Sequence, residues 1–264
     1  MPSYQWNAVD YAKSSAAQQQ WARELIRKLE LRGGETVLDI GCGDGKVTAE
    51  IASALSKGSV LGIDSSEAMI ALARSRYPAE AFPNLRFRLE DARSLSLRNE
   101  FDIAFSNATL HWIPDQQAVL RGIFDALKRS GKILLQMGGK GNAADVLTAF
   151  EKLMNADRWR GYFEGFDFTY GFFGPDEYTG WLRACGLKAK RIELIPKDMT
   201  YSDRSCFEAW IRTTWLPHTQ RVPEDKRDDF ISQVADYYLD HHPVDGNRVI
   251  HVAMMRLEVE ALKY

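Results

Sequence analysis

Apolar residues recur at helical spacing near the start of the chain, and a short apolar run follows them. Trp21, Leu25 and Leu29 repeat every four residues and predict one face of an amphipathic helix, which the glycine pair at 33–34 ends. The run at 36–40 (TVLDI) is short, β-branched and apolar. It therefore predicts a buried strand directly after the helix.

The same alternation continues to residue 137. Strands are predicted at 36–40, 59–63, 85–89, 101–105 and 132–137, with helices between them that include one at 117–129. Alternation of this kind is typical of βαβ units, which build a parallel sheet with helices on both faces. The expected fold class is therefore α/β, a doubly wound and mostly parallel sheet.

The second half of the chain departs from this rhythm. Residues 140–174 and 200–247 are predicted to be helical inserts rich in aromatic residues. A helix from Pro175 to Gly186 and a strand at 189–195 separate the two inserts, and a last strand at 249–257 follows the second. Ligands of open α/β sheets bind at the carboxyl ends of the strands. We therefore expect the inserts to be lids on a single domain (1–264), with residues 1–34 forming an N-terminal cap helix region.

Composition narrows the class of partner. The 264 residues carry a net charge of −2, with a sequence pI of about 6.2, so no basic field is available to gather phosphates. This disfavours nucleic acid as a ligand. The polar N-terminus lacks a signal peptide's apolar segment, and no apolar run approaches the roughly 20 residues of a membrane span. We expect a cytoplasmic protein with no membrane association, and the sequence predicts no oligomeric state.

Cysteine and histidine placement gives no metal site. Three cysteines without CxxC spacing fit neither a disulfide framework nor a zinc site. The adjacent pair at 241–242 (HH) is expected to lie in a loop, because neighbouring histidines rarely converge on one ion. The expectation is therefore a protein without a metal.

The stretch VLDIGCGDGK at 37–46 carries the most chemistry. Its glycines permit a tight turn and bring backbone N–H groups close to a ligand. A dinucleotide fingerprint fails because Lys46 takes the place of its third glycine, and a P-loop fails because Ile40 replaces its first glycine and Val47 follows the lysine. Asp39 would repel a phosphate but suits an ammonium group.

With these residues in place, the chain resembles the class I S-adenosylmethionine-dependent methyltransferases. Their first motif is acid-x-Gly-x-Gly-x-Gly, matched here by Asp39, Gly41, Gly43 and Gly45. The resemblance extends through residue 137 and includes an acid ending the second strand, an acid–alanine pair after the third and an asparagine after the fourth. It implies a Rossmann-like methyltransferase fold, an enzyme of this class, and S-adenosylmethionine as cofactor.

The resemblance also implies roles for individual residues. Asp39 and the glycine turn would hold the methionine end of the cofactor, Asp64 would accept both ribose hydroxyls, and the backbone of Asn107 would line the methionine end. The other implied cofactor contacts are Tyr11 in the cap region, Cys42 in the turn, Ser65 and Met69 beside the adenine, and Asp91 and Ala92 at its edge. Cys42 is interpreted as a small filler rather than a nucleophile, because nothing nearby would lower its pKa.

The segment after the fourth strand, SNATLHW at 106–112, bears on the methyl acceptor. It lacks the Asn/Asp-Pro-Pro-Tyr motif of enzymes that methylate adenine or glutamine amino groups. Together with the stretch at 11–21, it resembles small-molecule carboxyl methyltransferases of the trans-aconitate and juvenile-hormone-acid type. His111 would be a general base or a hydrogen-bond donor, Trp112 would line the acceptor pocket, and Gln18 would hydrogen-bond the acceptor.

The expected function is methyl transfer to a small-molecule acceptor, at a carboxylate oxygen. Arginines in the inserts (Arg158, Arg160, Arg212 and Arg221) are candidates to clamp an acidic substrate, and the sequence does not choose among them. The alternatives are methylation of a nitrogen, carbon or hydroxyl of a natural product, and a non-catalytic module that binds S-adenosylmethionine.

Overall fold

The computed structural model describes residues 16–264, with side chains from residue 21 onward. These residues divide into two compact units. The sheet unit comprises Gln18–Lys140, Tyr170–Ile195 and Arg256–Tyr264, and the helical unit comprises Gly141–Thr169 and Pro196–Met255.

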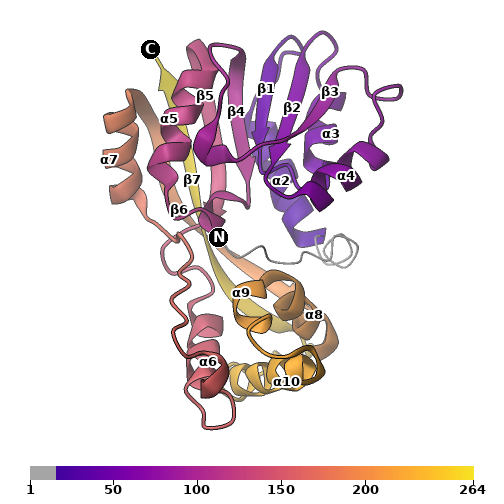
Figure 1. Cartoon of the computed structure of the whole chain (residues 1–264), viewed down its shortest axis with the longest axis vertical. Helices are drawn as coiled ribbons and strands as arrows, with labels where there is room; N and C mark the ends of the chain where they lie inside the picture. The colour runs from indigo at the N-terminus through magenta and orange to yellow at the C-terminus, as the bar shows by residue number, and fades with distance from the viewer. Residues whose placement is uncertain (1–15) are drawn as a thin grey trace. The chain divides into compact units, whose positions relative to one another are not determined.

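A seven-stranded sheet has the order β3-β2-β1-β4-β5-β7-β6 (Figure 1). The strands are β1 (Thr36–Ile40), β2 (Ser59–Asp64), β3 (Leu85–Leu89), β4 (Phe101–Asn107), β5 (Leu127–Gly138), β6 (Leu187–Tyr201) and β7 (Ile250–Lys263). Neighbouring strands among β1 to β5 run parallel, whereas β7 is antiparallel to β5. The doubly wound, mostly parallel fold expected from the sequence is confirmed.

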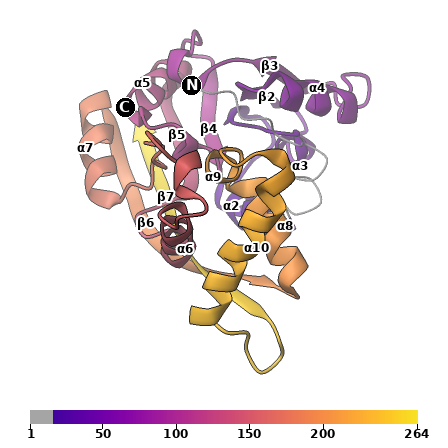
Figure 2. The same cartoon turned by 60° about the horizontal axis from the view of Figure 1, so that its bottom comes forward.

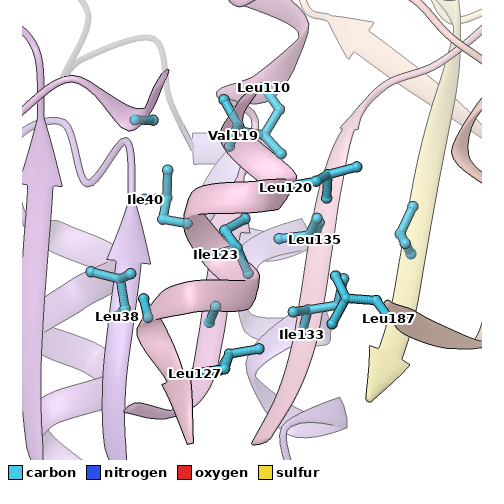
Figure 3. Close-up of a cluster of buried hydrophobic side chains, with 14 of the residues drawn as sticks. Leu38, Ile40, Leu110, Val119, Leu120, Ile123, Leu127, Ile133, Leu135 and Leu187 are labelled. Carbon is cyan, nitrogen blue, oxygen red and sulfur yellow. The ribbon is translucent and has the colours of Figure 1, made fainter. Parts of the chain in front are cut away.

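Helices cover both faces of this sheet. Leu25 of α2 (Ala16–Lys28) and Leu29, which follows that helix, pack in one buried cluster with α3 (Lys46–Ser53) and α4 (Glu67–Arg76). The opposite face is covered by α5 (Gln116–Ala126) and α7 (Pro175–Cys185). Figure 3 shows side chains of α5, β1 and β5 meeting in this second cluster. Near-continuous apolar strands are what burial on both faces requires.

The parallel register brings the carboxyl ends of four strands to one edge of the sheet. Ile40 of β1 pairs with Ile63 of β2, and Asp64 pairs with Leu89 at the end of β3. On the other side of β1, Asp39 pairs with Phe105 of β4. The loops that follow these strands are therefore neighbours, at the edge where open α/β sheets bind ligands.

Several element boundaries differ from the expectation. Strand β6 spans Leu187–Tyr201 rather than 189–195, and His241, expected in a loop, is the last residue of the helix Glu224–His241. Helix α5 ends at Ala126 rather than at 129, because the backbone N–H groups of Asn99 and Glu100 donate to the carbonyls of Asp125 and Ala126. Residues 127–131 then belong to β5, where Leu127 pairs with Phe101.

Strand β7 extends to Lys263, six residues beyond the expected end. Its residues from Arg256 to Leu262 pair with β5, and Leu257, Val259 and Ala261 alternate into the core. The length of this strand was underestimated, although the alternation of charged residues with these apolar ones is itself a strand pattern.

A buried carboxylate joins several elements of the sheet unit. Glu258 of β7 is 0% exposed and accepts hydrogen bonds from Lys28 Nζ at 2.7 Å and Gln136 Nε2 at 3.0 Å, and it forms an ion pair with Arg191 of β6. Burial alone would raise the pKa of Glu258, but hydrogen bonds from these three donors hold the pKa below its usual range. The charge is thus compensated, as a buried ion requires.

The helical unit is built around aromatic rings. Helix α10 (Glu224–His241) packs against α6 (Ala144–Met154), α8 (Arg204–Thr214) and α9 (Leu216–Thr219) (Figure 2). Phe150 lies 4.6 Å from His218 and 5.5 Å from Trp215 between ring centroids. Burial lowers the pKa of His218 to about 4, so this imidazole is neutral at pH 7. That the two inserts act as lids stays a prediction.

Candidate functional site

The turn after β1 is fixed by backbone hydrogen bonds. The N–H groups of Gly41 and Cys42 both donate to the carbonyl of Ile63, at 2.8 and 2.9 Å. Gly41 has φ +74°, and a Cβ added there would lie 2.1 Å from the side chain of Thr109. The Thr109 hydroxyl in turn donates to the Gly41 carbonyl at 3.0 Å. No residue with a side chain fits this position without moving its neighbours.

Gly43 differs from Gly41 in what surrounds it. Its φ is +53°, but a Cβ added there would meet no atom within 4 Å. The Gly43 N–H donates to Asp64 Oδ2 at 3.0 Å, and the Ser66 N–H donates to Asp64 Oδ1 at 2.8 Å. Burial raises the pKa of Asp64 although these N–H groups oppose the rise. The turn therefore holds a carboxylate beside open space that a side chain would fill.

Asp39 lies beneath this turn and is 2% exposed. The Thr48 hydroxyl donates to Asp39 Oδ2 at 2.7 Å. Burial raises the pKa of Asp39 to about 7, despite the hydrogen bond from Thr48 and with a further rise from the charge of Asp64. A cation placed against this carboxyl would therefore convert it from a partly protonated to an ionised group.

The predicted adenine contacts lie at the ends of β2 and β3. Met69 is buried and its N–H donates to Ser66 Oγ, the N-cap of α4, whereas Ser65 is exposed. Asp91 caps a short 3₁₀ turn that begins at the buried Ala92. The Asp91 carboxylate accepts the Arg93 N–H at 2.9 Å and pairs with its guanidinium, which lowers the pKa of Asp91.

Leu89 is a residue that sequence reasoning missed. It ends β3, pairs with Asp64 and is 49% exposed, which is unusual for a large apolar side chain on a sheet. An exposed leucine next to the Asp64 carboxylate offers an apolar surface for a flat ring. No sequence signal points to it, because the strand pattern does not distinguish an exposed last position from a buried one.

Asn107 ends β4, and the residues around it connect β4 to the glycine turn. The Asn107 carbonyl accepts from the Thr109 hydroxyl at 3.2 Å, and Ser106 Oγ donates to the Ile40 carbonyl at 2.8 Å. Thr109 and Ser106 were also missed, because a hydroxyl beside a strand end has no distinctive spacing. We call Asp39, the turn at 41–45 and Asp64 the glycine-turn end of the sheet edge.

His111 lies in the 3₁₀ turn Leu110–Trp112 and is buried. The Gly138 N–H, at the end of β5, donates to His111 Nδ1 at 3.3 Å. Burial, with a contribution from the positive charge of Arg256, lowers the pKa of His111 to about 3. The imidazole is therefore neutral at pH 7, and because Nδ1 accepts a hydrogen bond, its proton is on Nε2.

Aromatic rings surround His111. Its ring centroid lies 5.6 Å from that of Trp112 and 5.7 Å from that of Phe172, and Tyr170 stacks on Phe172 at 5.0 Å. The Gly171 N–H donates to the His111 carbonyl at 2.8 Å. Tyr170 and Phe172 were assigned to an insert by sequence, but they belong to the sheet unit. We call His111, Gly138, these rings and Arg256 the aromatic end.

The remaining predicted site residues are placed as follows. Gln18 lies in α2, its side chain is not described, and Tyr11 lies outside the described residues. Cys42 is buried, and burial raises the pKa of its thiol well above the usual value, which argues against a nucleophile.

The four insert arginines all have partners within the helical unit. Arg158 pairs with Asp229, Arg160 with Asp157 and Arg212 with Asp228. Arg221 donates to the carbonyls of Tyr162 and Glu164. Each therefore has a structural contact that explains its presence.

From residue 16 onward, no set of three or more His, Cys, Asp or Glu side chains is arranged to bind a metal ion. Within the same part of the chain, no helix combines the length and apolar character that crossing a membrane requires.

Known proteins match between about half and nearly all of this chain. A family model described as a methyltransferase domain matches residues 31–168. The trans-aconitate 2-methyltransferase of Variovorax paradoxus is 27% identical, and the match covers 98% of each chain. The malonyl-[acyl-carrier protein] O-methyltransferase of Bacillus cereus is 32% identical over 55% of this chain and 54% of that protein.

Among solved structures, a Haemonchus contortus phosphoethanolamine N-methyltransferase 2 in complex with S-adenosyl-L-methionine has a TM-score of 0.61. It is 19% identical, and the match covers 97% of this chain and 56% of that one. At this identity the likeness concerns the fold. The family match spans β1 to β5 and the glycine turn, over half of the chain, and the chain therefore belongs to the methyltransferase-domain family.

Proposed function

We propose that this protein transfers a methyl group from S-adenosylmethionine to an oxygen of a small carboxylic acid, as a trans-aconitate methyltransferase does. The methyl donor is S-adenosylmethionine, and the glycine-turn end holds it. The open space at Gly43 and the carboxylate of Asp64 beside it support this assignment. Each Asp64 oxygen accepts one backbone N–H and retains a lone pair for a ribose hydroxyl.

The other cofactor contacts follow the predicted roles. Asp39 and the turn bind the ammonium end, because a buried carboxyl with a raised pKa gains most from a cation. Met69 and Leu89 offer apolar surface for the adenine, and Asn107 lines the methionine end through its backbone. The assigned cofactor residues are Tyr11, Asp39, Gly41, Cys42, Gly43, Asp64, Ser65, Met69, Asp91, Ala92 and Asn107.

When bound, the cofactor supplies an electrophilic methyl group on a positively charged sulfur. In the transfer, an acceptor oxygen lone pair forms the new O–C bond and the C–S electron pair stays on sulfur. The negative carboxylate and the positive sulfonium become a neutral ester and a neutral thioether, so no proton moves. The protein has to hold the acceptor in line and exclude water.

The single observation that carries the choice of acceptor is the state of His111. Its Nδ1 accepts the Gly138 N–H and its pKa is about 3, so it is not poised to remove a proton at pH 7. An acceptor without a general base has to arrive with its nucleophilic lone pair free, as the carboxylate of a carboxylic acid does at this pH. His111 then serves as a neutral hydrogen-bond donor through Nε2, with Trp112 lining the acceptor site and Gln18 as a further polar contact.

The test is a coupled assay for S-adenosylhomocysteine with trans-aconitate as acceptor. We expect turnover by the wild-type protein and loss of cofactor binding in Asp64→Ala, measured by isothermal titration with S-adenosylhomocysteine. Asp157→Ala is the matched control, because it removes an acid from the surface of the helical unit. Cofactor binding unaffected by Asp64→Ala would contradict the cofactor site. Turnover of amines or phenols but of no carboxylic acid would contradict the acceptor class.

A further inference from the structure

Arg256 occupies a distinctive place at the aromatic end. It lies in β7 and pairs with Gly138, the last residue of β5, whose N–H binds His111. Its side chain is 4% exposed, and its guanidinium carbon lies 4.7 Å from the centroid of the Trp21 ring of α2. Because β5 runs parallel to β4, this arginine is at the same sheet edge as Asn107.

A buried cation at this position has an electrostatic effect on its surroundings. Taking a guanidinium out of water is unfavourable, and the face of Trp21 offsets part of that cost by a cation–π contact. The positive charge also reaches His111, where it adds to the effect of burial in lowering the imidazole pKa. The aromatic end therefore combines a fixed positive charge with a neutral hydrogen-bond donor.

We propose that Arg256 is the residue that makes the acceptor site specific for an anion, by binding a carboxylate of the acceptor through its guanidinium. This inference rests on the proposed function, since it names the residue that recognises the acceptor class. A planar guanidinium matches a carboxylate in geometry and charge, and the pair is strengthened where water is excluded.

Arg256 differs from its neighbouring cations in what it contacts. Lys28 and Arg191 both bind the buried Glu258, two residues along β7 from Arg256. Among the described residues, Arg256 is the arginine whose side chain is buried, and it contacts α2 and acts on His111.

The experiment measures acceptor binding separately from activity. Trans-aconitate is titrated into the full chain saturated with S-adenosylhomocysteine, by calorimetry at low ionic strength, for the wild type, Arg256→Gln, Arg256→Lys and Arg98→Gln. We expect Arg256→Gln to weaken binding by at least about tenfold and Arg256→Lys to be intermediate, since lysine keeps the charge without the fork. Arg98→Gln removes an exposed charge and should change the affinity by less than about twofold.

Two further readouts separate recognition from a structural role. S-adenosylhomocysteine affinity should be the same in Arg256→Gln and the wild type. The trimethyl ester of trans-aconitate, which has no charge, should bind the wild type at least about tenfold more weakly than the acid. If Arg256→Gln does not fold, the lysine variant and the acid–ester comparison decide the question.

Equal affinity of the wild type and Arg256→Gln for trans-aconitate, including no binding to either, overturns the role of Arg256. Equal affinity of the wild type for the acid and its ester does the same. Failure of the proposed function has a different signature: no carboxylic acid yields S-adenosylhomocysteine. Arg256-dependent binding of trans-aconitate without turnover would then leave the inference standing while removing the proposed reaction.

Discussion

The glycine-turn end and the aromatic end share one sheet edge but are built by opposite means. At the glycine-turn end, the backbone forms the structure: N–H groups of Gly41, Cys42 and Gly43 bind a carbonyl and a carboxylate from β2. At the aromatic end, the Phe172 ring, the Gly138 backbone N–H and the charge of Arg256 act on His111 from three distant segments. The difference shows that a site formed by backbone geometry restricts which residue types its own short segment can carry. A site formed by side chains from distant segments imposes no such local restriction.

The largest effect is expected from Gly41→Ala compared with Gly43→Ala. The first places a methyl group 2.1 Å from Thr109 at a positive φ, and should lower the free energy of unfolding by roughly 2–5 kcal/mol. The second has open space around it and should cost only about 1–2 kcal/mol. Both should weaken S-adenosylhomocysteine binding. Urea unfolding and calorimetry measure the two quantities, and equal destabilisation would break the distinction between these glycines.

The second prediction concerns acid pH and the aromatic end. His111 is neutral when folded, with a pKa of about 3, but its pKa is near 6.5 when the chain is unfolded. Between these values the unfolded state binds more protons, so stability falls as the pH falls through this window. By pH 5 the loss should be about 2 kcal/mol, and His111→Asn should remove it.

His218 of the helical unit provides the comparison for this prediction, because burial lowers its pKa to about 4 in the same direction. His218→Asn should remove a similar acid-dependent loss. Chemical denaturation at pH 7, 6 and 5 gives the values, and an NMR titration of His111 near pH 6.5 in the folded protein would contradict the assignment.

The third prediction concerns proton release at the glycine-turn end. Asp39 has a raised pKa of about 7, so below that pH it is protonated before a cationic ligand binds. Binding of the cofactor's ammonium group should release this proton, and affinity should fall by up to about tenfold per pH unit below 7. Calorimetry in buffers with different ionisation heats detects the proton. Asp39→Asn should show weaker binding and no release, and release unchanged in this variant would rule out Asp39.

The smallest effect is expected from Thr109→Val, which removes the hydroxyl that donates to the Gly41 carbonyl while keeping the shape. The cost should be about 1 kcal/mol of stability, the usual value of one such hydrogen bond. The measurement is urea unfolding beside Thr148→Val, whose hydroxyl bonds within the exposed part of α6. Similar losses of stability in both variants would show that the hydrogen bond from Thr109 to the Gly41 carbonyl contributes no more than the one within α6.

The comparison also explains what the sequence allowed us to predict. The Rossmann-like sheet and the methyltransferase family are confirmed, because strand–helix alternation and the glycine spacing are local patterns. Asp39, Gly41 and Gly43 lie within five residues of one another, so their relation is visible in the sequence. The roles assigned to the individual site residues stay predictions.

The aromatic end was accessible only in part. His111 and Trp112 were singled out, but Tyr170 and Phe172 were assigned to an insert and Arg256 was not considered. These residues lie 58 to 144 positions from Trp112, and no spacing rule connects them. The antiparallel pairing of β7 with β5 places Arg256 beside Gly138, and the hydrogen bond from the Gly171 N–H to the His111 carbonyl holds Tyr170 and Phe172 near the imidazole.

The contacts that Glu258 makes with Lys28, Gln136 and Arg191 have a consequence for the order of folding during synthesis. Lys28 and Glu258 are 230 residues apart, and the first cannot bind the second until β7 has left the ribosome. The apolar face of α2 is able to pack against β1 early, but the ion pair between Lys28 and Glu258 forms last. Translation that stops before β7 should therefore leave a chain whose helix α2 is held by its apolar face and by the Arg23–Glu50 ion pair, without the contact to Glu258.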